Sequence, residues 1–132
     1  MKQAVYCVII LLLFNCTEQS NESTKGILKG KISIGPICPV ETDPPQPGCK
    51  ATLETYKAYQ TAVWKSNKKN YLVKIDPDIE GNYQTELPEG EYYIDFEDKK
   101  VVRIGGANFP LAFKISNAQT TNLDIYIDTG IR

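Results

Sequence analysis

Residues 78–95, DIEGNYQTELPEGEYYID, contain two alternating runs of apolar and polar side chains joined by a short turn. In the first run Tyr83 and Leu87 are an even number of residues apart, so both side chains point to the same face of a strand. A second run starts at Tyr92, after residues 88–90, whose sequence Pro-Glu-Gly is typical of turns. The pattern predicts two half-buried β-strands with a chain reversal between them.

The same kind of alternation recurs on both sides of this stretch. Leu28, Ile32 and Ile34 alternate with polar residues near the start of the chain, and Trp64 is expected to be buried. Further strand signals lie at residues 51–56 and 61–65 (a strand or hairpin), 71–75, 113–115 and 123–127. No segment shows a convincing helical period. The chain is therefore predicted to be all-β, a single antiparallel β-sandwich of about seven strands with an immunoglobulin-like architecture.

A different pattern occupies the N-terminal end, MKQAVYCVIILLLFNC, residues 1–16. Its apolar run, residues 8–14, is shorter than the roughly 20 residues needed to span a bilayer. It fits the apolar core of a signal peptide, which is about 7–15 residues long. Lys2 supplies the positive start, and the chain becomes polar at once in residues 17–23. This layout predicts export from the cytoplasm.

The end of that segment resembles the bacterial lipoprotein signal, in which a lipobox ends in a cysteine. Leu13 matches the position three before Cys16, whereas Asn15 stands where the family usually has Gly, Ala or Ser. The resemblance implies that Cys16 receives a diacylglycerol and that residues 1–15 are removed as a signal peptide. Residues 16–25 would then be a flexible tether, and residues 26–132 the β-sandwich domain. An ordinary secretory signal or an uncleaved membrane anchor is the alternative.

The cysteine count fits an exported protein. With Cys7 removed with the signal and Cys16 acylated, Cys38 and Cys49 remain as a pair, and an oxidising compartment favours a disulfide between them. The alternative is two free thiols near a metal. The segment that the two cysteines bracket is rich in proline, which excludes a helix or a central strand there.

Charge and composition argue against several classes of function. Fifteen basic residues oppose sixteen acidic ones, so the basic excess of a nucleic-acid-binding protein is missing. Histidine is absent, which removes Ser-His-Asp and Cys-His catalysis and histidine-containing zinc sites. We therefore expect no enzyme activity, no cofactor and no nucleic-acid partner.

Acidic residues suggest two kinds of site. Asp76, Asp78 and Glu80, followed by Gly81, resemble the start of a calcium loop, but Leu87 stands where the loop needs a bidentate Glu. The alternative is a solvated acidic turn. A small carboxylate-dependent hydrolase would need two carboxylates in one cleft. The simpler explanation for the candidate carboxylates is that they are solvent-exposed charges on strands and turns. These candidates are Asp95, Glu97, Asp98, Asp124 and Asp128.

Two resemblances cover most of residues 26–132. The first motif consists of Gly81, Tyr83, Leu87, Pro88, Gly90 and Tyr92. It resembles the hairpin of carboxypeptidase regulatory-like and other prealbumin-like domains. The second consists of Gly35-Pro36-x-Cys38-Pro39-Val40, Cys49 and the terminal Asp128-Thr129-Gly130-Ile131-Arg132. This second motif is similar to that of a group of bacterial secreted proteins built on the same sandwich fold. The resemblance implies that this chain is a non-catalytic extracytoplasmic module.

The terminal motif has two interpretations of its own. It is either a recognition tail or a closing strand whose end is fixed by Asp128 or Thr129, with Gly130 turning the chain. For the whole chain we expect a lipid-anchored, non-catalytic binding or structural accessory module of the bacterial cell envelope. The membrane, through the lipid on Cys16, and an envelope protein or glycan are the expected partners. A small carboxylate-dependent envelope hydrolase and a calcium-stabilised adhesin are the alternatives.

Overall fold

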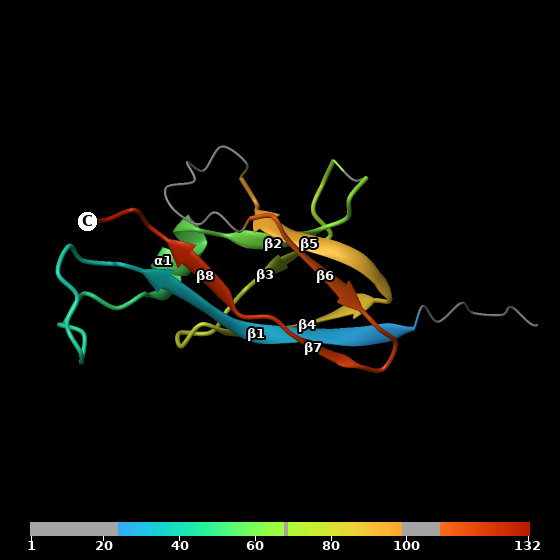
Figure 1. Ribbon diagram of the computed structural model, residues 1–132, viewed down its shortest axis with the longest axis horizontal. Helices are drawn as coiled ribbons and strands as arrows, with labels where there is room; N and C mark the ends of the chain where they lie inside the picture. The colour runs from blue at the N-terminus through green and yellow to red at the C-terminus, as the bar shows by residue number, and fades with distance from the viewer. Residues whose placement is uncertain (1–23, 68, 99–108) are drawn as a thin grey trace, which may run out of the picture.

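The computed structural model describes residues 24–67, 69–98 and 109–132 as two β-sheets packed face to face with one short helix (Figure 1). One four-stranded sheet contains β4 (Asn82–Pro88), β1 (Lys25–Gly35), β7 (Thr120–Asn122) and β8 (Ile125–Asp128). The other contains β3 (Val73–Ile75), β2 (Thr61–Trp64), β5 (Gly90–Phe96) and β6 (Leu111–Ile115), in that order. The predicted all-β sandwich is confirmed. Cys16, the signal at residues 1–15 and most of the predicted tether lie outside the described residues.

The long strand β1 organises the first sheet. It pairs antiparallel with β4 on one side, and on the other side it pairs in parallel with β7 and then β8. The parallel pairing departs from the purely antiparallel sandwich that we expected. Its cause is the turn after β6, which brings Ala118 next to Lys25 through a hydrogen bond of 2.9 Å between the Ala118 amide and the Lys25 carbonyl oxygen. From there β7 and β8 can only run in the same direction as β1.

Glycine makes this close pairing possible in the middle of β1. A Cβ atom at Gly30 would collide with the backbone carbonyl of Leu123, at the junction between β7 and β8. The Leu123 amide in turn donates a 2.9 Å hydrogen bond to the carbonyl oxygen of Lys29. Gly30 therefore lets the last part of the chain approach β1 closely enough to complete the sheet.

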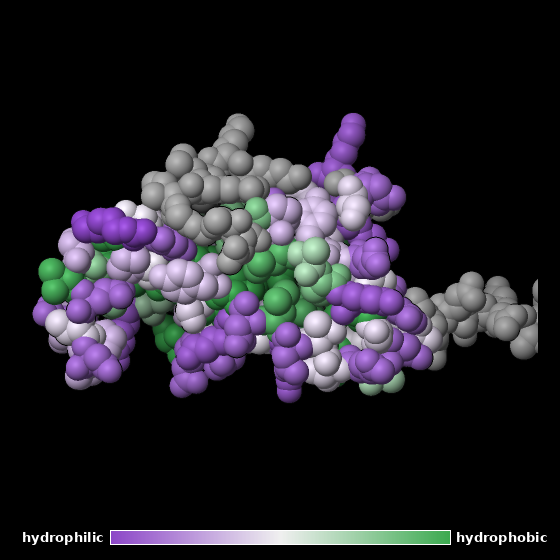
Figure 2. All heavy atoms as spheres, in the orientation of Figure 1, coloured by the Kyte–Doolittle hydropathy of each residue, from purple (hydrophilic) through white to green (hydrophobic). Residues whose placement is uncertain are grey.

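The core lies between the inner faces of the two sheets and agrees with the predicted alternation. The inward side chains of β1, β4, β5 and β8 are buried: Leu28, Ile32, Ile34, Tyr83, Leu87, Tyr92, Ile94, Phe96, Ile125 and Ile127. Leu111, Phe113 and Leu123 are partly buried against this cluster. Figure 2 shows hydrophobic atoms gathered in the middle of the face in view, between β8 and β6.

The two runs of residues 78–95 form strands, but they do not form a hairpin. β4 pairs with β1, whereas β5 pairs with β2 and β6 in the opposite sheet. A single residue, Glu89, connects them, and the Tyr92 hydroxyl donates a 2.7 Å hydrogen bond to the Pro88 carbonyl oxygen across this corner. The chain reverses as predicted, but at this corner it passes from one sheet to the other. The two strands therefore face each other across the core, where both bury their apolar side chains.

The predicted strand at residues 51–56 is wrong, because this segment forms helix α1 (Leu53–Ala58). Thr52 caps the helix: its hydroxyl accepts a hydrogen bond from the Thr55 amide at 3.3 Å, and the Thr55 hydroxyl accepts one from the Thr52 amide at 3.0 Å. Only Tyr56 of the helix is buried. One buried position in six residues leaves no helical period to detect.

Candidate functional site

The disulfide loop forms one end of the molecule. It follows directly on β1 and extends beyond the two sheets, at the end opposite to the start of β1 (Figure 1). Cys38 and Cys49 are joined in a disulfide, as predicted. Between them the chain is exposed, and Val40 keeps 69% of its surface in contact with solvent. Binding residues lie disproportionately often on loops that a rigid scaffold positions, and this loop presents an exposed apolar side chain.

Replacing both Cys38 and Cys49 by serine is expected to lower the free energy of unfolding by about 2–3 kcal/mol, because the cross-link restricts the unfolded chain. The prolines already restrict that chain, which favours the lower end of this range. Urea unfolding of the wild type with and without reductant checks the result. The reduced wild type should match the double variant. Equal midpoints for the oxidised and reduced wild type would show that the bond does not stabilise the fold.

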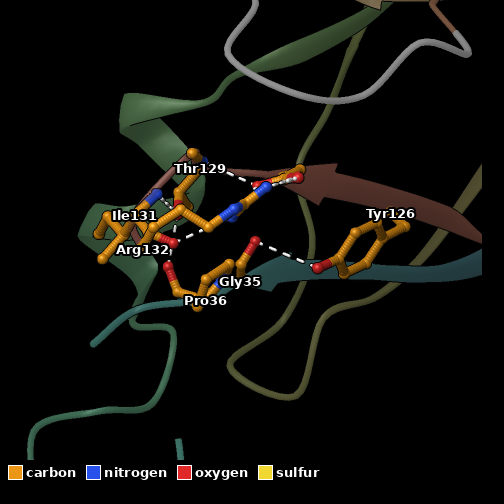
Figure 3. Close-up of polar contacts among 8 residues, drawn as sticks. Gly35, Pro36, Tyr126, Thr129, Ile131 and Arg132 are labelled. Carbon is orange, nitrogen blue, oxygen red and sulfur yellow. Dashed lines mark hydrogen bonds and ion pairs between the residues drawn. The ribbon is translucent and has the colours of Figure 1, made fainter. Parts of the chain in front are cut away.

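The two ends of the second sequence motif meet at the base of this loop (Figure 3). Parallel pairing of β1 with β8 brings Thr129 next to Gly35 and Pro36. The Thr129 amide donates a 3.0 Å hydrogen bond to the Gly35 carbonyl oxygen, and its hydroxyl donates one of 2.5 Å to that of Pro36. The Tyr126 hydroxyl also donates to the Gly35 carbonyl oxygen, at 3.2 Å. The C-terminal motif thus holds the first residues of the loop.

Asp128 fixes the last residues of the chain. Its carboxylate accepts hydrogen bonds from the Arg132 guanidinium at 2.7 and 3.1 Å and from the Gly130 amide at 2.8 Å. These contacts, led by those from Arg132, hold the pKa of Asp128 below its usual range. Gly130 has a positive φ of 76°, so it turns the chain as predicted. The geometry favours a fixed closing segment over a free recognition tail.

A groove of about 580 Å³ lies beside the loop. Ile37, Ala51, Tyr56 and Ile79 contribute apolar surface, and charged residues of both signs, among them Glu41 and Lys50, also line it. Burial is the main cause that raises the pKa of Tyr56. Leu53 and Ile79 add exposed apolar surface at this end. This arrangement offers both apolar and charged surface to a partner.

Two of the three calcium candidates, Asp78 and Glu80, accept hydrogen bonds from neighbouring groups in a tight turn. The Asp78 carboxylate accepts hydrogen bonds from the amides of Glu80 and Asn82, both at 2.9 Å, and from the Asn82 side chain at 3.1 Å. The Asn82 contacts are the main cause of the lowered pKa of Asp78. Gly81 has a φ of 88°, and a Cβ there would collide with the Ile32 carbonyl oxygen. In residues 24–67, 69–98 and 109–132, no group of three or more acidic residues or cysteines could hold a metal.

Asp76 and Asp78 instead line a polar groove of about 570 Å³ over β1 and β4. Lys29, Lys31 and Asp124 also line it, and the Asp124 carboxylate accepts a 2.9 Å hydrogen bond from the Lys31 amide. Tyr83, from the first sequence motif, also lines this groove. Its hydroxyl donates to the Leu123 carbonyl oxygen, and burial, with a smaller effect of Asp124, raises its pKa.

The five carboxylates considered for a hydrolase are spread over the described part of the molecule. Asp95 is buried in β5, Glu97 forms a 2.7 Å ion pair with Lys74, and Asp128 is held by Arg132. Of these five carboxylates, Asp124 alone lines the polar groove. The five thus do not meet in one cleft, but Asp124 shares its groove with Asp76 and Asp78.

Sequence reasoning missed a third groove of about 440 Å³ on the outer face of the second sheet, next to Tyr93. Trp64 was predicted to be buried and is, at 4% exposure. However, it lies on this outer face rather than between the sheets, in contact with Tyr71 and Tyr93. The sequence signal was the alternation in β5, but the groove depends on how three strands are aligned. The helix found in the described segments, α1, is neither long nor apolar enough to cross a membrane.

Comparison with known proteins identifies no family. No family model matches the chain, and no curated protein is significantly similar to it. Among solved structures, a DUF3823 family protein from Parabacteroides merdae is 15% identical with a TM-score of 0.46, over 80% of this chain and 47% of that one. The minor pilin of Streptococcus agalactiae is 16% identical with a TM-score of 0.47, over 80% and 44%. The chain thus spans less than half the length of these proteins, and no ligand or partner is carried over from them.

Proposed function

We propose that this chain is a lipid-anchored, non-catalytic module of the bacterial cell envelope, which contacts an envelope partner through its disulfide-loop end. The lipoprotein-like signal ending at Cys16 supports the anchor, and the Cys38–Cys49 disulfide suits an oxidising compartment. The lack of histidine in the sequence supports a role without catalysis.

One observation carries the proposal: the anchor side and the loop lie at opposite ends of β1. The strand begins at Lys25, nine residues after Cys16, and ends at Gly35, where the disulfide loop starts. Its 11 residues span about 33 Å at the usual rise of an extended strand. The turn around Asn117 lies beside Lys25 and the exposed Val40 lies in the loop (Figure 1). A lipid on Cys16 would hold the first end near the membrane and present the second away from it.

This orientation can be tested with the lipidated chain in vesicles. A single azide-bearing residue is introduced at Asn117 or at Val40 and labelled with the same fluorophore. The vesicles carry lipids with a nitroxide quencher on the headgroup. We expect stronger quenching at position 117 than at position 40, because quenching falls steeply with distance.

The matched controls are the same two labelled chains carrying Cys16→Ser. Without a lipid they should stay in solution, and neither label should be quenched. Equal quenching of the two lipidated chains, or stronger quenching at position 40, would reject the proposed orientation.

A further inference from the structure

The outer face of the second sheet carries an aromatic row that ends in a small residue. Trp64 of β2 pairs with Tyr93 of β5, and Tyr93 pairs with Ala112 of β6. Residues directly opposite each other on neighbouring strands have side chains on the same face. The row therefore runs across three strands as two large rings followed by a methyl group. Ala112 is exposed, so the surface beyond Tyr93 is not filled by a third ring.

The two rings are held in a defined arrangement. The planes of Trp64 and Tyr93 are nearly parallel, at 9°, with ring centroids 6.5 Å apart. Tyr71 packs edge-on against Trp64, with ring centroids 5.8 Å apart and an angle of 79° between the planes, and Tyr71 is 37% exposed. These contacts hold Tyr93, itself half-buried, in position against a buried indole. A ligand that packs on Tyr93 would meet a ring that is already ordered, which lowers the entropy cost of binding.

The groove of about 440 Å³ adjoins this open side of the row. Its apolar lining comes from Tyr92, Tyr93, Ala112 and Phe113, and its polar groups come from Ser66, Glu91 and Lys114. Glu91 and Lys114 are directly opposite each other on β5 and β6. The groove thus combines aromatic residues, of which Tyr93 belongs to the outer face, with a carboxylate, an ammonium group and a hydroxyl, and the formal charges of its lining cancel. Its volume lies within the range of about 300–1,000 Å³ typical of small-molecule sites.

We propose that this groove binds a neutral saccharide, with a sugar ring packed against Tyr93 above Ala112. A pyranose ring presents an apolar face of C–H groups and a rim of hydroxyls. The face matches the Tyr93 ring, while the hydroxyls can donate to Glu91 and accept from Lys114. Because the two charges cancel, the groove does not favour an anionic or a cationic ligand. The inference names a ligand class for the module proposed above and rests on that proposal, but it uses a different surface from the loop end.

The test is titration of the full chain, purified from membranes in detergent, with neutral β-1,4-linked hexasaccharides. Four are used: those of glucose, mannose, xylose and N-acetylglucosamine. Trp64 is the single tryptophan of the chain and stacks on Tyr93, so its fluorescence reports binding, with titration calorimetry as the second readout. We expect at least one hexasaccharide to bind and to change the emission of Trp64.

Three variants locate the site. Tyr93→Ala should weaken binding at least tenfold, whereas Tyr93→Phe keeps the ring and should bind within about twofold of the wild type. Ala112→Leu fills the groove from an exposed position and should also weaken binding at least tenfold. Glu86→Ala, which changes an exposed residue of β4 in the other sheet, should leave binding unchanged. Thermal melts verify that each variant is folded.

Two outcomes would overturn the proposal: no binding of any of the four hexasaccharides, or unchanged binding by folded Tyr93→Ala. Either outcome would remove the saccharide groove alone. The lipid anchor is tested separately, by membrane fractionation of Cys16→Ser. A failure of saccharide binding is therefore distinguishable from a failure of the proposed function.

Discussion

Replacing Tyr83 by alanine is expected to lower the free energy of unfolding by about 3–5 kcal/mol, the usual cost of removing a buried aromatic side chain. Tyr83 is 5% exposed and belongs to the central core cluster. Its hydroxyl donates a 2.5 Å hydrogen bond to the Leu123 carbonyl oxygen. This one side chain therefore links β4 to the junction of β7 and β8, on the other side of β1. Its loss leaves both a cavity and an unsatisfied carbonyl group.

The matched variant is Tyr83→Phe, which keeps the ring and removes the hydroxyl. It should cost about 1–2 kcal/mol, the usual effect of leaving a buried hydrogen-bonding group without its partner. Urea unfolding followed by circular dichroism measures both variants. A loss below about 1 kcal/mol for Tyr83→Ala would contradict the position of Tyr83 in the core.

Replacing Cys16 by serine is expected to move the protein from the membrane pellet to the soluble fraction. A serine hydroxyl cannot form the thioether that the lipoprotein-like signal implies. A diacylglycerol inserts two acyl chains, and two chains are needed for stable anchoring, since a single chain binds only marginally. The expected change is therefore nearly complete rather than partial.

The control is Cys7→Ser, which changes the other cysteine of the N-terminal segment and should leave fractionation unchanged. Fractionation of envelopes followed by immunoblotting measures both variants. Retention of Cys16→Ser in the membrane pellet would contradict the lipid anchor and favour an uncleaved apolar anchor instead.

Except at residues 51–56, which form a helix, strand positions and their buried faces could be predicted from the sequence, because a period of two depends only on local residues. Tyr83 and Leu87 are buried together, as are Tyr92, Ile94 and Phe96. Sheet membership could not be predicted in this way. The alternation in β4 and β5 is the same whether the strands pair with each other or face each other across the core, so the expected hairpin was wrong.

The candidate site shows the same division. The pairing of Cys38 with Cys49 followed from cysteine count and compartment, whereas the contact of Thr129 with Pro36 depends on the parallel register of β1 and β8. Trp64 could be predicted to be buried, since large aromatics usually are. That it is buried on an outer face, next to a groove at Tyr93, depends on three strands that are distant in sequence.

The most direct test of the lipid anchor is the mass of the N-terminal peptide of the protein isolated from membranes. The predicted peptide begins at Cys16, lacks residues 1–15 and carries a diacylglycerol on the cysteine sulfur. A chain that begins at Met1, or one cleaved elsewhere with an unmodified Cys16, would contradict the lipid anchor and with it the proposed place of this domain in the envelope.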